Sequence, residues 1–226
     1  MRTLLTSDVC IVNIEPITLA VDMAIARRRR RSYHHGNLRA ALVEAALGLV
    51  QREGVEALTL RGAARLAGVS PAAPYRHFAD KRALLAAVAE EGFRLLAAAL
   101  REAGGTTEPR ERFRARGPAY VSFAIRHPSH FRVMFGRELA DRTGYPGLRD
   151  AAAAAFDALI EGMAEAQRAG VVREGDPRDL GLTAWSAMHG LSSLLLTGRL
   201  QAMFGASADE LTARVGTNIY RGLAPR

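Results

Sequence analysis

Side chains that could bind a polyanion are concentrated in one short segment of the chain. Residues 27–82 carry twelve lysines and arginines against four acidic residues, whereas residues 83–226 carry eighteen against sixteen and residues 1–26 carry one against three. The formal net charge of +8 therefore arises in residues 27–82. A localised basic patch is typical of proteins that bind nucleic acid. The alternative is a solvated basic face that has no partner.

The stretch "SPAAPYRHF", which begins at Ser70, lies in this basic segment and contains two prolines. Proline lacks an amide hydrogen and is tolerated in an α-helix only within its first turn. The pattern therefore predicts an α-helix with Ser70 as its N-cap, Pro71 in the first position and Pro74 in the fourth. Phe78, at the end of the stretch, is predicted to fill the core.

The residues before this helix complete a helix-turn-helix pattern. Thr59 can cap a short helix that ends at Gly68, and the next predicted helix follows after a tight turn. In such motifs the second helix lies in the major groove of DNA. The small side chains of Ala72 and Ala73 permit a close approach and can meet thymine methyl groups. Arg76, one turn further on, is able to contact guanine through two hydrogen bonds.

The rest of the chain has helical rather than strand character. Alanine, leucine, arginine and glutamate dominate after Ser32, and β-branched residues do not alternate as they do in a strand. We therefore expect an all-α protein. A first helix is predicted from about Leu38 to Gly54. Further helices are predicted from Asp80 to about Ala103 and over residues 109–127, 129–136, 147–169, 177–201 and 207–222, the last two with start signals at Asp176-Pro177 and at Ser207 with Glu210.

Parts of the sequence resemble a known protein family. The stretch "LTLRGAARLAGVSPAAPYRHFADKRALLAAV", with its Gly-Val-Ser turn and Tyr-x-His-Phe segment, closely resembles the DNA-binding domain of the TetR family of bacterial transcriptional regulators. The resemblance covers about residues 33–90. The stretch "AWSAMHGLSSLLL" resembles the Trp-x-x-x-His-Gly signature of one C-terminal ligand-domain subgroup of that family, and "YHHGNLRAAL" resembles the opening of the same subgroup.

The resemblance implies roles for residues of the helix-turn-helix. Tyr75 and His77 would hydrogen-bond to the DNA backbone, Lys81 would contact a phosphate, and Thr59 would do so through an amide or hydroxyl at its helix N-terminus. Helix N-termini bind phosphate well, and phosphate contacts position a protein without specifying the sequence that it reads. The predicted DNA-binding residues are Thr59, Ser70, Pro71, Ala72, Ala73, Tyr75, Arg76, His77 and Lys81.

The resemblance also implies a homodimer and a small-molecule effector. The last two predicted helices, over residues 177–201 and 207–222, would pair with those of a second copy in a four-helix interface. Two recognition helices would then lie about 34–36 Å apart on a palindromic operator in double-stranded DNA. We therefore expect residues 33–82 to form the DNA-binding domain of a regulator, and residues 83–226 its ligand-binding and dimerisation domain. A repressor is the favoured interpretation and an activator is the alternative.

Candidate ligand-binding residues are aromatic, methionine and histidine side chains of the second domain. Trp185 and His189 stand four residues apart and share a helix face, where they could line a ligand pocket or pack between subunits. Such side chains at helical spacing are also common in protein cores, so both interpretations stay open. The full candidate set is Phe123, His127, Phe131, Met134, Trp185, Met188 and His189.

Histidines occur as His34-His35, as His127-x-x-His130 and as His189, without the cysteines or nearby carboxylates of a recognisable metal site. We expect neither a metal nor a cofactor, and we expect His127 to end a helix. No phosphate-binding loop, glycine-flanked serine or pair of carboxylates indicates an enzyme. Two alternatives remain, namely an architectural DNA-binding protein without an effector and an all-α enzyme.

Residues 1–32 are expected to lie outside the folded domains. Residues 1–22 are either an upstream extension from a misplaced start codon, since Met23 directly precedes the first coherent part of the sequence, or a disordered tail. The run "ARRRRRSYHH" is either a flexible arm along a minor groove or phosphate backbone, or a solvated tail. A lone cysteine, Cys10, and the lack of a signal peptide or membrane-spanning run favour a cytoplasmic protein.

Overall fold

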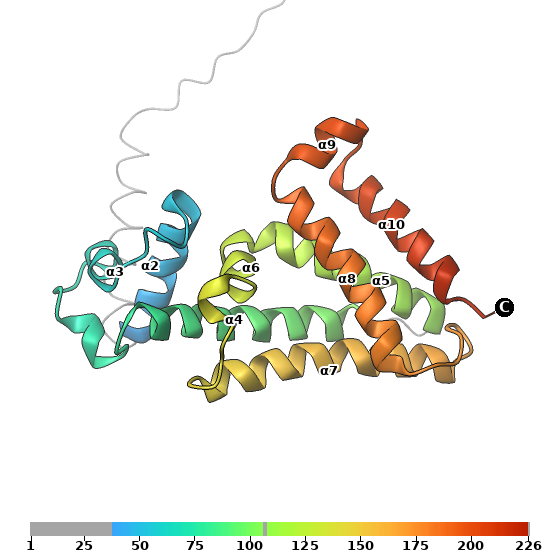
Figure 1. Cartoon of the computed structure of the whole chain (residues 1–226), viewed down its shortest axis with the longest axis horizontal. Coiled ribbons are helices and arrows are strands. Elements are labelled where there is room, and N and C mark those ends of the chain that lie inside the picture. Colours follow the sequence, from blue (N-terminus) through green and yellow to red (C-terminus); the bar gives the residue numbers. More distant parts are fainter. Residues whose placement is uncertain (1–37, 106–107, 226) are drawn as a thin grey trace, which may run out of the picture. The chain divides into compact units, whose positions relative to one another are not determined.

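The computed structural model describes residues 38–105 and 108–225 (Figure 1). Every regular element within these ranges is a helix, which confirms the predicted all-α class. Contacts divide the chain into two units, Met1–Ala41 and Leu42–Arg226, and the second holds nearly all the described residues. The predicted N-terminal extension and basic arm lie outside the described residues. None of the described helices is long and apolar enough to cross a membrane.

The helices α2 and α3 have the bounds that their capping residues predict. Helix α2 covers Leu38–Glu53 and is followed by Gly54, whose φ of 85° lies in the left-handed region. Helix α3 covers Leu60–Ala67, and the hydroxyl of Thr59 accepts a hydrogen bond from a backbone amide of its first turn at 2.9 Å. Gly68, with a φ of 71°, ends α3 in the same left-handed conformation.

The predicted recognition helix differs from the structure. Instead of an α-helix from Ser70, the chain makes a turn and then a 3₁₀-helix, η1, over Ala73–Arg76. The reason is that Pro74 has no amide hydrogen to donate to the carbonyl of Ser70, so the hydrogen bond that would continue an α-helix is missing. The amides of His77 and Phe78 both donate to the carbonyl of Pro74, at 2.9 Å. Phe78 is 4% exposed, as expected for a core residue.

The most extensive helix pairing joins α4 and α7, which lie side by side (Figure 1). Helix α4 covers Lys81–Glu102, and Asp80, at the predicted start, accepts a hydrogen bond from an amide of the first turn at 2.8 Å. Helix α7 covers Pro146–Arg168. Its buried positions include Ala151 and Ala155.

Two helices separated by a single residue follow α4. Helix α5 covers Pro109–Arg126 and α6 covers Pro128–Met134. His127, between them, donates its backbone amide to the carbonyl of Phe123 at 2.8 Å and so ends α5, as predicted. A short 3₁₀-helix, η2, over Arg137–Leu139 then leads toward α7.

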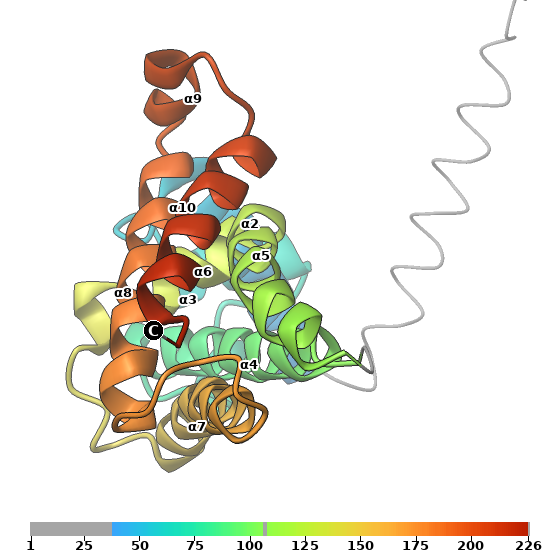
Figure 2. The ribbon, with the colours of Figure 1, turned by 90° about the vertical axis from the view of Figure 1, so that its right-hand side faces the viewer.

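The stretch predicted as one helix over residues 177–201 is interrupted. Helix α8 covers Pro177–Leu195, and a new helix, α9, covers Arg199–Phe204. The break is at Gly198, whose φ of 71° is left-handed and cannot continue a right-handed helix. Helix α10 covers Ala208–Leu223 and begins with the predicted capping box. Figure 2 shows α8 and α10 side by side, with α9 at the end where they are connected.

Candidate DNA interface and ligand pockets

The segment after α3 exposes most of the residues predicted to contact DNA. Tyr75, Arg76 and His77 are consecutive and all exposed, and 54% of the surface of Tyr75 is accessible. Tyr75 and Arg76 lie in η1, where three residues per turn make their side chains point about 120° apart; Pro74 occupies the buried side, and His77 follows as the C-cap. Of the other predicted contact residues in this segment, Ser70, Pro71 and Ala72 are exposed and Ala73 is half-buried.

Thr59 and Lys81, the other two predicted DNA contacts, already have partners within the chain. The Thr59 hydroxyl oxygen accepts the capping hydrogen bond of α3, and the Lys81 ammonium donates to the carbonyl of Glu56 at 2.9 Å. Each keeps an unused donor, since a hydroxyl has its own hydrogen and an ammonium has three. Their predicted phosphate contacts are compatible with these bonds and stay predictions.

Two arginines of α3 add positive charge that the motif does not single out. Arg61 and Arg65 stand four residues apart, share one face of α3 and are both exposed. Their spacing within the predicted helix is the signal that could have identified them. They extend the positive charge of the helix-turn-helix beyond Arg76.

The first turn of α4 is held to two other segments by neighbouring side chains. Lys81 donates to the carbonyl of Glu56, as described above. Arg82 donates through Nε to the carbonyl of Glu138 at 3.1 Å and through Nη2 to the carbonyl of Asp141 at 2.7 Å. The carboxylate of Asp141 also lies 3.8 Å from the Arg82 guanidinium. The start of α4 is therefore bonded both to the α2–α3 loop and to the segment after α6.

A buried tyrosine joins α5 to α8. Tyr120 is 2% exposed, and its hydroxyl oxygen accepts a hydrogen bond from the indole nitrogen of Trp185 at 3.1 Å. The same hydroxyl lies 2.9 Å from Nδ1 of His189. Burial raises the pKa of Tyr120 and lowers the pKa of His189, so both side chains are neutral at pH 7. Which of the two groups donates the hydrogen in this bond depends on the histidine tautomer.

Other aromatic rings surround this hydrogen-bonded trio. The ring of His189 stacks on Phe131 with centroids 5.1 Å apart and meets the edge of Phe135 at 4.5 Å. The centroids of Trp185 and His189 are 5.5 Å apart, so the two residues do share a face of α8, as their spacing predicts. The cluster fixes the orientation of Trp185 within the helical part of the chain.

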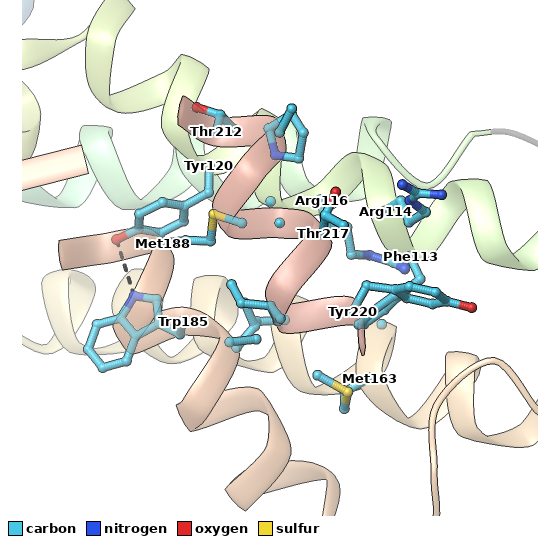
Figure 3. A pocket seen from close by; sticks show the side chains of 18 residues that line it. Phe113, Arg114, Arg116, Tyr120, Met163, Trp185, Met188, Thr212, Thr217 and Tyr220 are labelled. Carbon is cyan, nitrogen blue, oxygen red and sulfur yellow. Dashed lines mark hydrogen bonds between the residues drawn. The ribbon is translucent and has the colours of Figure 1, made fainter. Parts of the chain in front are cut away.

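A first cavity, of about 240 Å³, lies among α5, α7, α8 and α10 and is called here the α10 pocket. Figure 3 shows Tyr120 and Trp185 at one end of it and Phe113, Arg114 and Tyr220 at the other. The lining is mostly apolar. The pocket therefore suits an apolar occupant more than a polar one.

One cation in the lining of the α10 pocket is already paired. Arg116 lines this pocket, its side chain is 15% exposed, and its guanidinium donates to the carboxylate of Glu165 at 3.0 Å. The guanidinium of Arg112 approaches the other oxygen of the same carboxylate at 3.1 Å. Glu165 thus offsets much of the charge that Arg116 brings to this pocket.

A second cavity, of about 380 Å³, lies chiefly between α4 and α7 and is called here the α4–α7 pocket. Tyr120, Leu159 and Trp185 line both pockets and so form a common wall between them. The full lining of the α4–α7 pocket is Phe93, Leu96, Leu100, Tyr120, Phe135, Arg142, Arg149, Ala152, Ala153, Ala155, Phe156, Leu159 and Trp185.

The predicted ligand-binding residues are only partly brought to these pockets. Trp185 lines both of them and Met188 lines the α10 pocket. Phe123, Phe131 and Met134 are 1%, 4% and 0% exposed and lie in the core outside both linings. His127 and His189 also lie outside both linings, although His189 bonds to Tyr120.

Several pocket residues carry no signal in the sequence. Phe93 of α4, Tyr120 of α5 and Phe135, which directly follows α6, meet only in the folded chain. Arg142 lies in the loop before α7, where a lone arginine looks like any solvated residue. Only the three-dimensional arrangement of the helices identifies these side chains.

The histidines that the structure describes do not assemble into a metal site. The rings of His127 and His130 are 5.7 Å apart, and Nε2 of His130 lies 3.5 Å from a carboxylate oxygen of Glu91. Among the described residues, no group of three or more His, Cys, Asp and Glu side chains is arranged to hold a metal ion. Burial, together with the charges of His130 and Arg126, lowers the pKa of His127.

Comparisons with known families match both parts of the chain. Residues 42–88 match the bacterial regulatory proteins of the tetR family, and residues 113–217 match the tetracyclin repressor-like C-terminal domain. No curated protein is significantly similar to the chain.

Several solved structures are similar to the chain. A protein of unknown function from Rhodococcus sp. RHA1 is 39% identical, with 85% of this chain and 98% of that one covered and a TM-score of 0.75. The TetR family transcriptional regulator PfmR from Thermus thermophilus is 22% identical over 81% of this chain and 99% of its own, with a TM-score of 0.65. A bacterial regulatory protein in the tetR family from Rhodococcus RHA1 is 20% identical over 84% and 99%, with a TM-score of 0.67.

The two regulators of 22% and 20% identity show only that the fold is similar. The family is shown by the two matched domains. An N-terminal match over α2, α3, η1 and the start of α4 is joined to a C-terminal match that extends from α5 into α10. The fold agrees with that of the tetR-type regulators. The chain therefore belongs to the TetR family of DNA-binding transcriptional regulators.

Proposed function

We propose that the chain is a homodimeric, cytoplasmic repressor that a small molecule releases from a palindromic operator. The observation that carries the proposal is the combination, in one chain, of an exposed helix-turn-helix and internal apolar pockets. An architectural DNA-binding protein has no use for such pockets. An all-α enzyme would have no use for the exposed cationic segment at η1.

In this proposal, one group of residues in and around η1 contacts the DNA backbone and another residue reads the bases. Tyr75, His77, Thr59 and Lys81 bind phosphates and set the position of the protein on DNA. Arg76 enters the major groove and reads a guanine. The exposed residues before η1 (Ser70, Pro71, Ala72 and the half-buried Ala73) form the bare surface that lets the backbone come close to the bases.

The dimer forms through α8 and α10 in this proposal. Leu182 and Leu194 of α8 are 49% and 52% exposed. Ser186 and Gly190 stand between them at four-residue intervals, so the four residues form one stripe along α8. Gly190 has no atom within 4 Å of where a Cβ would stand, so its surface is open to a second body. Two α8 helices that pack along these stripes, flanked by α10, would bury the exposed leucines.

The ligand acts by favouring one separation of the two DNA-binding parts over another. A ligand shifts such an equilibrium only by its difference in affinity for the two states. The bonds of Arg82 to the segment after α6 give a physical connection between the pocket region and the start of α4. The proposal divides the chain into a DNA-binding domain over residues 33–82 and a ligand-binding and dimerisation domain over residues 83–226.

The proposal is tested by footprinting the full chain on the DNA that flanks its own gene. We expect two protected half-sites about one helical turn apart, which disappear in the presence of the effector. Equal affinity for scrambled DNA would contradict a sequence-reading repressor. A footprint of one half-site, with a single protomer bound, would contradict the dimer.

A further inference from the structure

We propose that the α4–α7 pocket binds an apolar molecule that ends in a carboxylate, and that the guanidinium of Arg142 receives the carboxylate. The inference rests on the proposed function, because such a molecule would be the effector. It goes beyond that function by assigning the pocket, the chemical class of the ligand and the residue that selects it.

The size and lining of the pocket suit a small apolar molecule. Its volume of about 380 Å³ lies within the range of about 300–1,000 Å³ of ligand sites, whereas the α10 pocket, at about 240 Å³, lies below it. Its wall combines the rings of Phe93, Phe135 and Phe156 with alanines of α7. An aliphatic or aromatic body would find mostly carbon there.

Arg142 supplies a cation whose charge no lining residue offsets. Its Nε and Nη2 donate to the carbonyls of Leu139 and Met134, at 3.3 and 3.1 Å, and these neutral partners leave the charge uncompensated. Its guanidinium carbon lies 4.9 Å from the ring centroid of Phe93, so the group is held against the pocket wall. In the described part of the chain, no acidic side chain lines this pocket. Its Nη1 makes no hydrogen bond to any described residue and remains for a ligand oxygen.

Partial burial makes this lone charge costly until an anion arrives. Loss of hydration lowers the pKa of Arg142, although a guanidinium remains protonated at pH 7. A partly desolvated cation without a counter-charge is unfavourable, and a bound carboxylate would offset the cost. Arg149, an exposed residue of α7, lines the same pocket and adds a second positive charge.

The α10 pocket makes the contrast within the same protein. There Arg116 already shares the carboxylate of Glu165 with Arg112. Each pocket is lined by two arginines, Arg114 and Arg116 in the one and Arg142 and Arg149 in the other, and by no acidic side chain among the described residues. The difference is that Arg116 is bonded to a carboxylate, whereas the bonded partners of Arg142 are neutral carbonyls. A ligand carboxylate therefore gains more from Arg142 than from Arg116.

The test uses the single tryptophan of the chain as the probe. Trp185 is the only tryptophan and lies in the wall that the two pockets share, so its fluorescence reports an occupant of either pocket without DNA, and the variants below assign the pocket. The full-length dimer is titrated with sodium decanoate, below its micellar concentration, and with 1-decanol, which has the same carbon chain and no charge. We expect decanoate to bind at least about tenfold more tightly, as one charge-assisted hydrogen-bonded contact would provide.

Three variants assign the preference to the pocket. Arg142→Gln should weaken decanoate binding about 10- to 100-fold, so that the variant binds decanoate about as weakly as it binds decanol. Arg149→Gln should weaken it about two- to fivefold, as expected for an exposed charge, and Arg149→Glu should weaken it further. The matched control is Arg168→Gln, which removes an exposed arginine from the same helix outside both pockets and should change nothing.

Two results would overturn the proposal. One is equal affinity of the native protein for decanoate and decanol, or no binding of either. The other is an unchanged decanoate affinity in Arg142→Gln. If that variant does not fold, as judged by circular dichroism, Arg149→Glu decides, and an unchanged affinity there refutes the assignment. Operator binding is measured in parallel without ligand, so that the two proposals can be separated. If the protein binds the operator but not decanoate, only the proposed ligand class is wrong. If it binds decanoate but not the operator, only the proposed repressor function is wrong.

Discussion

Removing one oxygen atom tests whether the Tyr120 hydroxyl holds the wall between the two pockets. Tyr120→Phe keeps the ring and deletes the hydroxyl that bonds to Trp185 at 3.1 Å and to His189 at 2.9 Å. The indole N–H and Nδ1 of the imidazole both lose a partner. An unsatisfied polar group in a buried site costs about 1–3 kcal/mol, and because Trp185 and His189 are only half-buried, water can replace part of the loss.

We therefore expect the free energy of unfolding to fall by about 1–3 kcal/mol in total. With a urea slope of about 1–3 kcal/mol per molar, this corresponds to a midpoint about 1 M lower, measured at equal protein concentration because a dimer's stability depends on concentration. The matched control is Tyr145→Phe, since the Tyr145 hydroxyl makes no hydrogen bond among the described residues; its midpoint should stay unchanged. A loss below about 0.5 kcal/mol for Tyr120→Phe, the range of a surface substitution, would show that the hydroxyl is dispensable.

Four further predictions concern the DNA interface, the dimer interface and the half-buried His189. Lys81→Ala should weaken binding to all DNA sequences alike and reduce the log–log salt slope by about one, measured against operator and scrambled duplexes. Arg76→Ala should cost about 1–3 kcal/mol on the operator and relax the preference at one base position in each half-site; an equal loss on scrambled DNA would make Arg76 a phosphate contact. Gly190→Leu should leave monomer folding intact, since a Cβ there meets no atom within 4 Å, but should weaken the dimer by about 1–3 kcal/mol in analytical ultracentrifugation; an unchanged dimer would place Gly190 outside the interface. Burial lowers the folded-state pKa of His189 below its ordinary value of 6.5, so the unfolded chain takes up the proton first as the pH falls. The stability that His189 contributes is therefore complete above about pH 6.5 and should be lost at lower pH. His189→Gln should make the free energy of unfolding, measured in urea, less dependent on pH in this range, and an unchanged dependence would contradict the prediction.

Helix ends with a specific chemical cause could be predicted from the sequence. Thr59, Asp80 and Ser207 each offer a side-chain oxygen to free amides, and each caps a helix in the structure. Gly54 and Gly68 end helices in the left-handed conformation that other residues avoid. These are local effects, so the local sequence is enough to reveal them.

Two errors in the predicted elements arose where local signals compete. Pro71 and Pro74 were compatible with the first turn of an α-helix, but loss of the Pro74 hydrogen bond leaves the segment as a turn and a 3₁₀-helix. The apolar pattern across residues 177–201 predicted one continuous helix, but Gly198 adopts a left-handed conformation and interrupts it. In both cases a single residue ends or prevents the α-helix that the surrounding residues favour.

The pockets could not be predicted, because their residues are neighbours only after folding. The common wall joins Tyr120 of α5 to Trp185 of α8, 65 residues later, through a hydrogen bond. Helical spacing identified Trp185 and Met188 but equally pointed to Phe123, Phe131 and Met134, which fill the core. Periodicity shows which side of a helix is apolar, and not whether that side meets another helix or an empty space.

The hydrogen bonds of Lys81 and Arg82 join the start of α4 to two distant segments. Lys81 and Arg82 are adjacent, yet their partners lie 25 and 56–59 residues away along the chain. In the proposed function, a movement of the segment around Asp141, which adjoins Arg142 of the α4–α7 pocket, would displace the first turn of α4 and, through the bond of Lys81, the α2–α3 loop.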